Sequence, residues 1–367
     1  MIKINKRRLV KTFKELAGIY GPSKGERDVA DYVLGRLGAD WSVSEDDAGE
    51  AIDGEAGNIL AKMDGEGDAV LLSAHLDTVQ PCAGVKAKIK NGYLVSRGDT
   101  ILGADNRAAV AAMLELADIA GRLRRRRPVE MLFTVAEEVG LQGAKHADYG
   151  AIESRRAFVL DTSEPPGYAV NAAPGSELVT ATFRGRAAHA GIEPEKGINA
   201  IQMASSAIAS MQLGRIDHET TANIGLISGG KAVNIVSEEA KIEGEVRSHD
   251  AEKLRRHVDH ITRKMEKAAA EFGGVVEIKW EEAYVSYRLS DDTDPVELFR
   301  LAARAADLMP KLVAGGGGSD ANVFNARGLP AIVLGCGFEK IHTTDERIAV
   351  ASLAKLAELA TALVTVE

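Results

Sequence analysis

The sequence contains little cysteine: Cys82 and Cys336 are the only two among its 367 residues. They lie far apart and in no metal-type spacing, which excludes a disulfide framework and is typical of a reducing compartment. No apolar run reaches the roughly 18 residues that a membrane-spanning helix needs. The N-terminal segment carries positive charge but lacks the apolar centre of a signal peptide. We therefore expect a cytoplasmic protein that makes no contact with a membrane.

A long basic stripe is also missing, and the formal net charge is −9. This balance argues against nucleic acid as a partner. The one basic run, Arg122 with residues 124–127, follows a helical pattern and precedes Pro128, so we interpret it as a solvated helix end. The length and the 45% hydrophobic content indicate two globular domains rather than one.

Short apolar runs alternate with helical patterns through most of the chain. Buried strands are predicted over residues 57–63, 69–75, 129–136, 157–161 and 330–337, and the chief helix between them over residues 106–123. Two further helices are expected over residues 4–19 and 23–38, the second beginning with Ser23 and Glu26 in the spacing of a capping box. This alternation predicts an α/β domain whose mostly parallel sheet carries helices on both faces.

The pattern changes near Pro174. From there the chain reads strand–helix–strand–strand–helix–strand over about a hundred residues, an order typical of a ferredoxin-like α+β fold. The α/β style resumes after about Tyr287. We therefore predict a catalytic domain of residues 1–173 and 287–367, with an inserted α+β domain of residues 174–286.

Polar residues gather where the predicted strands end. In open α/β sheets, ligands bind outside the carboxyl ends of the strands, so we expect these side chains to converge on one spot. They are His75 and Asp77, Glu137 and Glu138, Asp161, and His342, which lies just beyond the last strand.

Histidines and carboxylates without cysteine form an N/O site that suits Zn²⁺, with Mn²⁺ or Co²⁺ as alternatives. The motif "GDTILGADNRAAVAA" places Asp105 where a glycine-broken loop meets a helix, so its short carboxylate can approach two ions. We predict a dinuclear centre that Asp105 bridges. His75 and Asp161 would hold one ion, and Glu138 and His342 the other.

Two further carboxylates at the strand ends are predicted to have roles other than metal binding. Asp77 would share a strand face with His75 and could orient its imidazole. Glu137, beside a ligand but itself free of metal, is the candidate general base for hydrolysis. Taken singly, each motif has a plainer interpretation: Asp105 could be a helix N-cap and the Glu-Glu pair a solvated surface. Their shared position at strand ends favours the metal site.

Eight segments together resemble the M20 family of metallopeptidases, and in particular its peptidase T-like (tripeptide aminopeptidase) branch. They follow one another in the family's order over nearly the whole chain: "SAHLDTV", "GADNRAAVAA", "TVAEEVGLQGAK", "VLDTS", "RGRAAHAG", "KAVNIVSEEAKIEGEVRS", "GGGGSDANVF" and "IHTTDE". The resemblance implies a zinc-dependent hydrolase of small peptides, in which a metal-bridging water is the nucleophile and Glu137 the general base. It also implies a homodimer formed through the inserted lid domain.

The resemblance assigns further residues. His189 matches a histidine that reaches the partner's active site and stabilises the tetrahedral oxyanion. Asn234 and Arg247 match positions that contact substrate, and Gly317 and Ser319 lie in a segment similar to the family's substrate-binding loop. Where many relatives carry Asp-Lys after the bridging aspartate, this chain has Asn106 and Arg107.

The sequence leaves more than one substrate class open. An aspartate at position 161 tends to accompany aminopeptidase-type members of the family and a glutamate the deacylases, so Asp161 favours peptides with a free amino end. A deacylase or amidase acting on N-acyl amino acids is the alternative enzyme. A non-catalytic binding protein on the same fold would be favoured if a ligand or Glu137 were missing, and none is missing. The HExxH motif of other zinc peptidases does not occur.

Overall fold

The computed structural model describes residues 4–366 and divides the chain into two compact units. Unit 1 comprises Met1–Ala172, Arg288–Gly315 and Ser319–Glu367, and unit 2 comprises Ala173–Tyr287 with Gly316–Gly318. The chain therefore leaves unit 1 and returns to it, and the three glycines before Ser319 pack with unit 2 although the segments on either side belong to unit 1.

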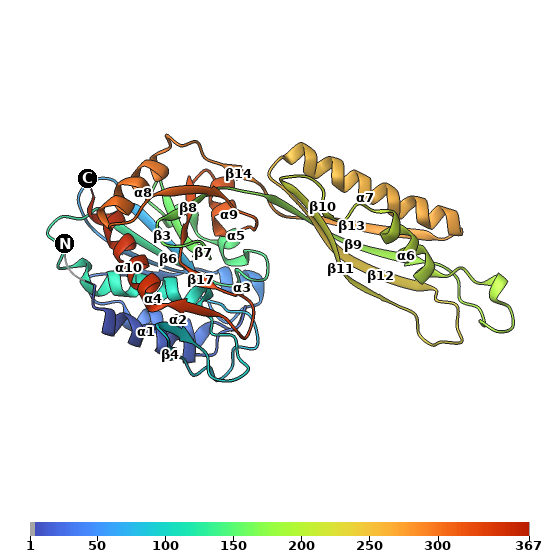
Figure 1. Cartoon of the computed structure of the whole chain (residues 1–367), viewed down its shortest axis with the longest axis horizontal. Coiled ribbons are helices and arrows are strands. Elements are labelled where there is room, and N and C mark those ends of the chain that lie inside the picture. Colours follow the sequence, from blue (N-terminus) through green and yellow to red (C-terminus); the bar gives the residue numbers. More distant parts are fainter. Residues whose placement is uncertain (1–3, 367) are drawn as a thin grey trace. The chain divides into compact units, whose positions relative to one another are not determined.

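Unit 1 is built on a nine-stranded sheet (Figure 1). The strand order is β1-β2-β6-β3-β7-β16-β8-β14, with β15 beside β8. The four central strands β6, β3, β7 and β16 run parallel to one another, whereas β1, β2 and β8 pair antiparallel. The strands are β1 Ser42–Glu45, β2 Ile59–Met63, β3 Val70–His75, β6 Val129–Thr134, β7 Ala157–Thr162, β8 Tyr168–Ala173, β14 Tyr287–Arg288, β15 Lys311–Ala314 and β16 Ala331–Gly335.

The central strands are mostly apolar because helices cover both of their faces. Every residue of β3, β6 and β16 is buried, which is why these strands appear in the sequence as continuous apolar runs. The helices α1, α4, α8 and α10 pack together on one face, and α3, α5 and α9 on the other. Their bounds are α1 Lys6–Gly18, α2 Arg27–Arg36, α3 Ala48–Ile52, α4 Ala104–Ala120, α5 Gln142–His146, α8 Asp294–Ala305, α9 Asp320–Ala326 and α10 Val350–Thr365.

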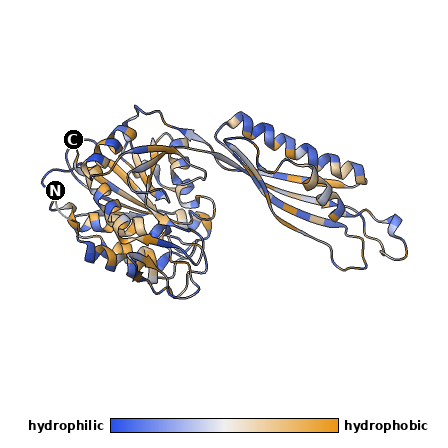
Figure 2. Cartoon of the chain, viewed as in Figure 1, coloured by the Kyte–Doolittle hydropathy of each residue, from blue (hydrophilic) through white to orange (hydrophobic). Residues whose placement is uncertain are grey.

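Helix α4 is the central helix of unit 1. It contacts α1, α10 and the strands β3 and β7, and almost all of its side chains are buried. A helix enclosed on all sides must be apolar around its whole circumference, and its many alanines let the neighbours approach closely. Figure 2 shows the same apolar character in the interior of unit 1. This helix carries Asp105 into the site described below.

A small four-stranded sheet of unit 1 was not predicted. Its order is β17-β18-β5-β4, and it joins a hairpin near residue 90 to the segment around His342. Its strands are only two or three residues long: β4 Lys88–Lys90, β5 Tyr93–Val95, β17 Phe338–Glu339 and β18 Arg347–Ala349. Strands this short leave no clear alternation in the sequence.

Unit 2 has a five-stranded antiparallel sheet of order β10-β11-β12-β9-β13. Helices α6 and α7 lie together against it (Figure 1), and residues such as Phe183, Ile242 and Met265 form its separate core. The chain order β9-α6-β11-β12-α7-β13 confirms the predicted ferredoxin-like pattern. The bounds are β9 Gly175–Arg184, α6 Ala200–Ser210, β10 Gly214–Arg215, β11 Thr220–Gly229, β12 Glu239–Ser248, α7 Ala251–Phe272 and β13 Val275–Tyr284.

The predicted capping box is wrong. Helix α2 begins at Arg27, and neither Ser23 nor Glu26 caps it with a side chain. Ser23 Oγ instead donates to Asp77 Oδ2 at 2.6 Å, and Glu26 Oε1 accepts the backbone N–H of Ala136 at 2.8 Å. These two side chains are used for contacts with the strand ends, which the local spacing could not reveal.

The basic run lies in the loop between α4 and β6. Arg126 donates to the carbonyl of Ala120 at the end of α4, and Arg127 to that of Val366 just beyond α10. These arginines therefore satisfy carbonyl groups at helix ends. Within residues 4–366, no helix is both long and apolar enough to cross a membrane.

Candidate active site

The predicted strand-end residues meet at one edge of the unit 1 sheet. His75 is the last residue of β3, Glu137 and Glu138 follow β6, and Asp161 lies near the end of β7. Because these three strands are parallel neighbours, their carboxyl ends open on the same side. The side chains form two groups with the spacing of a metal site. One group is His75, Asp105 and Glu138, and the other is His75, Glu137 and Asp161.

The carboxylate of Asp105 lies between two histidines. Its Oδ1 is 3.1 Å from His75 Nε2, and its Oδ2 is 3.7 Å from His342 Nε2. Each histidine also approaches a second carboxylate: His75 Nε2 lies 3.5 Å from Asp161 Oδ1, and His342 Nε2 lies 3.0 Å from Glu138 Oε1. This arrangement gives two histidine–carboxylate pairs that share one aspartate.

Asp77 is fully buried behind the first pair. Its Oδ1 lies 3.2 Å from His75 Nδ1 and leaves Nε2 free to face Asp105. The same carboxylate accepts the backbone N–H groups of Glu137 at 3.0 Å and Glu138 at 3.1 Å. Burial raises the pKa of Asp77, but its hydrogen bonds, first that with His75, outweigh burial and hold the pKa below its ordinary value. Asp77 is therefore a stable anion that fixes three of the candidate residues.

Two further carboxylates of the site, those of Glu137 and Asp161, have raised pKa values. Burial, followed by repulsion from Asp161, raises the pKa of Glu137 well above its ordinary value. Burial also raises the pKa of Asp161 to about 8, with further repulsion from Asp105. Bringing several carboxylates together in a buried place is unfavourable unless positive charge compensates them.

The pKa values of the two histidines are also raised, which favours their positively charged form. Burial lowers the pKa of His75, but its contacts with Asp105, Asp161 and Asp77 outweigh burial and raise the pKa well above its ordinary value. The hydrogen bond to Glu138 raises the pKa of His342 to about 9. Each histidine thus sits in a strongly negative environment. Two imidazole nitrogens among several clustered carboxylates are a donor set that fits two divalent cations of the zinc type.

Three buried side chains near the site were not predicted. Asp320, at the start of α9, accepts from Thr134 Oγ1 at 2.6 Å, and burial raises its pKa to about 6. Burial raises the pKa of Glu26 to about 7. The carboxylate of Glu346 accepts the backbone N–H groups of Ala104 at 3.0 Å and Asp105 at 3.2 Å. The motifs "GGGGSDANVF" and "IHTTDE" contain Asp320 and Glu346, but nothing in the sequence showed their contacts.

Asn106 follows the candidate bridging residue Asp105, and the structure shows its contact. Asn106 is fully buried, and its Nδ2 donates to Asp161 Oδ1 at 3.3 Å. The neighbouring Arg107 is also buried, and its Nη2 donates to the carbonyl of Gly21 at 3.4 Å. Burial lowers the pKa of Arg107 to about 10. An amide at position 106 therefore donates to a candidate ligand, which a carboxylate could not do when ionised.

The predicted substrate-contacting residues other than Ser319 belong to unit 2. His189 and Asn234 lie side by side, since the backbone N–H of Ala190 donates to the carbonyl of Asn234 at 3.0 Å. Arg247 projects from β12, with Nη2 donating to Glu245 at 2.9 Å and Nη1 close to Gly317. Ser319 lies in unit 1, where its Oγ accepts from Ala321 as the N-cap of α9.

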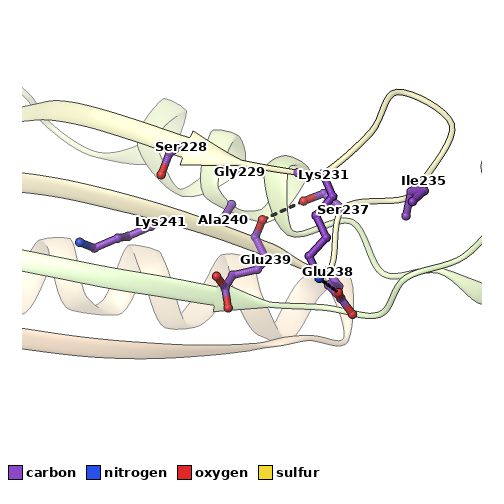
Figure 3. A pocket seen from close by; sticks show the side chains of 10 residues that line it. Ser228, Gly229, Lys231, Ile235, Ser237, Glu238, Glu239, Ala240 and Lys241 are labelled. Atoms are coloured by element: carbon purple, nitrogen blue, oxygen red, sulfur yellow. Dashed lines mark hydrogen bonds and ion pairs between the residues drawn. The ribbon is translucent and has the colours of Figure 1, made fainter.

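A pocket of about 280 Å³ lies elsewhere in unit 2, between the end of β11 and the start of β12 (Figure 3). Lys231 and Glu238 form an ion pair of 2.7 Å in its wall, and Ser237 Oγ donates to the carbonyl of Glu239. None of the candidate catalytic or metal residues lines this pocket. The groups that could hold a metal ion lie at the strand ends of unit 1.

Comparisons with known proteins agree with this geometry. The sequence profile of peptidase family M20/M25/M40 matches residues 71–366. A protein of Bacillus subtilis, named uncharacterized protein YqjE, is 40% identical over 366 residues, 98% of each chain. Among solved structures, the aminopeptidase PepT of Bacillus cereus is 39% identical with a TM-score of 0.88, each chain being covered to 98%. A tripeptidase of Staphylococcus aureus is 37% identical with a TM-score of 0.92, covering 99% of this chain and 98% of its own.

The chain belongs to peptidase family M20/M25/M40. It is a metallopeptidase with the two-unit fold of that family, and its nearly full-length similarity extends to structures of PepT-type peptidases. The predicted family and fold class are therefore confirmed.

Proposed function

We propose that this protein is a dinuclear metal-dependent aminopeptidase that removes the N-terminal residue of small peptides. The observation that carries the proposal is the position of Asp105, whose two oxygens face two different histidine–carboxylate pairs. A site for one ion would not require a carboxylate shared between two histidine–carboxylate pairs. Full-length similarity to a PepT aminopeptidase and to a tripeptidase supports the choice of small peptides as substrates.

Asp105 would bridge the ions, with His75 and Asp161 on one and Glu138 and His342 on the other. The nitrogen and oxygen donors suit Zn²⁺, and Mn²⁺ or Co²⁺ are the alternatives. When bound, two such ions would polarise the scissile carbonyl and lower the pKa of the attacking water.

The chain itself would move the proton. Glu137 follows the same strand end as Glu138 but lies in the group with His75 and Asp161, where its carboxylate can reach a water at the site. In the reaction Glu137 would accept the proton of the attacking water and then deliver it to the leaving amine.

Unit 2 would supply substrate contacts and the dimer. Arg247 has the planar guanidinium that suits a peptide carboxylate, and Gly317 lies beside it. Asn234, and Ser319 of unit 1, would also hold peptide groups. We expect a homodimer formed through unit 2, in which His189 stabilises the oxyanion in the partner's site. Exposed apolar side chains in unit 2, including Leu226, Ile227 and Val233, support an interface there.

Hydrolysis of N-acyl amino acids is the second candidate activity, because the same metal chemistry would serve it. Asp161 in place of glutamate is the residue that favours peptides with a free amino group.

A substrate panel on metal-loaded protein separates the two activities. It should include di- and tripeptides, the same peptides N-acetylated, and N-acyl amino acids, each also with the Glu137→Ala variant. We expect cleavage of the free-amine peptides alone, lost in the variant. Cleavage of N-acyl amino acids alone would refute the aminopeptidase proposal, and absence of any turnover with metal bound would refute both enzymatic proposals.

A further inference from the structure

Glu346 is a buried carboxylate with no place in the proposed reaction. Its exposure is 1%, although it follows the exposed Asp345 in a surface segment. Its two oxygens accept from two successive backbone groups, Oε2 from Ala104 and Oε1 from Asp105. The partners are more than 240 residues away in the chain. A buried carboxylate held over such a distance requires specific partners, and here the partners belong to the segment that presents the central aspartate.

The segment that carries Asp105 cannot provide this contact by itself. Gly103 precedes helix α4 in the left-handed conformation, at φ +71°, and offers no side chain to cap it. Asp105 and Asn106 then depart from helical dihedrals before the regular helix continues. The N–H groups at such a helix start have no partner within the helix. Glu346 supplies both the acceptors and the negative charge that a helix start favours.

Glu346 is also tied to the candidate ligand His342, four residues earlier in the chain. The segment between them is a compact turn, in which the backbone N–H of Glu346 donates to the carbonyl of Thr343 at 3.0 Å. Thr343 Oγ1 in turn donates to the carbonyl of Lys340 at 2.7 Å. His342 itself has a φ of +60° and a side chain that is 47% exposed, so the turn rather than surrounding packing sets its position.

From these contacts we infer that Glu346 is a positioning residue for the metal centre: it joins the turn that presents His342 to the backbone that presents Asp105. The inference rests on the proposed function, because it assumes that these two side chains hold a common ion. Glu346 would touch neither metal nor substrate. It would set the separation of a bridging ligand and a terminal ligand of the same ion, a kind of support whose loss typically weakens metal binding 10- to 100-fold.

The test compares Glu346→Ala and Glu346→Gln with the wild-type protein and with Asp345→Ala as a matched control. Asp345 is the adjacent acid, but its side chain is 76% exposed and pairs with Lys340 at the surface. Zn²⁺ binding to the chelator-treated proteins is measured by isothermal titration calorimetry without substrate, and kcat and KM are measured on a tripeptide at saturating Zn²⁺. Circular dichroism confirms folding.

We expect Glu346→Ala to bind one of two Zn²⁺ ions about 10- to 100-fold more weakly, with kcat reduced and KM little changed. Glu346→Gln keeps one acceptor oxygen but turns an NH₂ toward the second N–H, so it should lie between wild type and Glu346→Ala. Asp345→Ala should match the wild type. If Glu346→Ala does not fold, the same comparison is made with Glu346→Gln.

Unchanged affinity for both ions in a folded Glu346 variant would overturn the inference and leave the proposed function intact. Equal weakening in Asp345→Ala would also overturn it, because the effect would then belong to the turn and not to the buried carboxylate. Failure of the wild-type protein to bind two ions would instead contradict the dinuclear site on which the inference rests.

Discussion

Asp77 holds Glu137 in place: the backbone N–H of Glu137 donates to Asp77 Oδ1 at 3.0 Å, and the same oxygen lies 3.2 Å from His75 Nδ1. One buried aspartate therefore orients a candidate metal ligand and the candidate general base together. Ser23 donates to its other oxygen, so the anion is also anchored from the segment that precedes α2. Positioning of base and metal is expected to be coupled through this residue.

Asp77→Asn should therefore impair metal binding and catalysis at once. The amide keeps the shape but replaces one acceptor oxygen with a donor, so either the contact with His75 or a backbone N–H bond is lost. We expect Zn²⁺ affinity to fall about 10- to 100-fold, as measured by calorimetry. Asp68→Asn, at a side chain that is 81% exposed, is the control. Wild-type affinity in Asp77→Asn would show that the contact has no such role.

Substitution of the two adjacent glutamates should have different effects on catalysis and on metal content. Glu137→Gln removes the base, and we expect kcat to fall about 10²- to 10⁴-fold with both ions still bound. Glu138→Gln removes a ligand of the ion shared with His342, so bound metal should fall from two ions to one. Metal content by atomic emission, measured beside kcat, checks both. Loss of metal in Glu137→Gln would assign it to the ligands instead.

Glu26 should make the stability of the metal-free protein depend on pH. Burial raises its pKa from 4.5 to about 7, so the folded state holds the proton more tightly than the unfolded state. The stabilisation that comes from this tighter proton binding is complete below the pKa of Glu26 in the unfolded state. It is lost as the pH rises through the folded-state pKa of about 7. At about 1.4 kcal/mol per pKa unit, the loss amounts to about 3 kcal/mol.

Glu26→Gln lacks this titration and is the comparison. Between pH 5 and pH 8, the wild-type free energy of unfolding should fall relative to that of Glu26→Gln by about 2.5 kcal/mol. Urea denaturation in the presence of a chelator measures the difference. A constant difference across this range would mean that Glu26 titrates normally in the folded protein.

The proposed homodimer predicts where a charge should disrupt association. Leu226 and Val233 are 64% and 104% exposed in unit 2, and Leu226 lies on β11 beyond its short pairing with β10. Leu226→Glu or Val233→Glu should shift the protein from dimer to monomer in sedimentation velocity. Met309→Glu, at a residue 86% exposed in unit 1, should leave the dimer intact. A wild-type monomer would refute the interface outright.

The strand-end residues could be predicted from sequence because two local signals coincide there. Continuous apolar runs mark buried parallel strands, and three of these runs end in a histidine or carboxylate or are followed directly by one. His75, Glu138 and Asp161 therefore follow from pattern alone. The ferredoxin-like order of unit 2 was equally visible, because β9, β11, β12 and β13 are each ten residues long and helix α7 is strongly amphipathic.

The supporting contacts could not be predicted because they depend on the tertiary fold. Glu346 and Ala104 are 242 residues apart, and no local pattern reports such a pairing. Ser23 and Glu26 gave a misleading signal, since their spacing matches a capping box while tertiary partners occupy both side chains. The strands β17 and β18 are too short to show alternation, although they flank the turn with His342.

Anomalous diffraction at the zinc absorption edge, from crystals of the zinc-loaded protein, would show whether Asp105 bridges two ions. We expect two peaks about 3.5–4 Å apart, one beside His75 and Asp161 and one beside His342 and Glu138, with an oxygen of Asp105 on each. A single peak, or two peaks that do not share Asp105, would contradict this expectation.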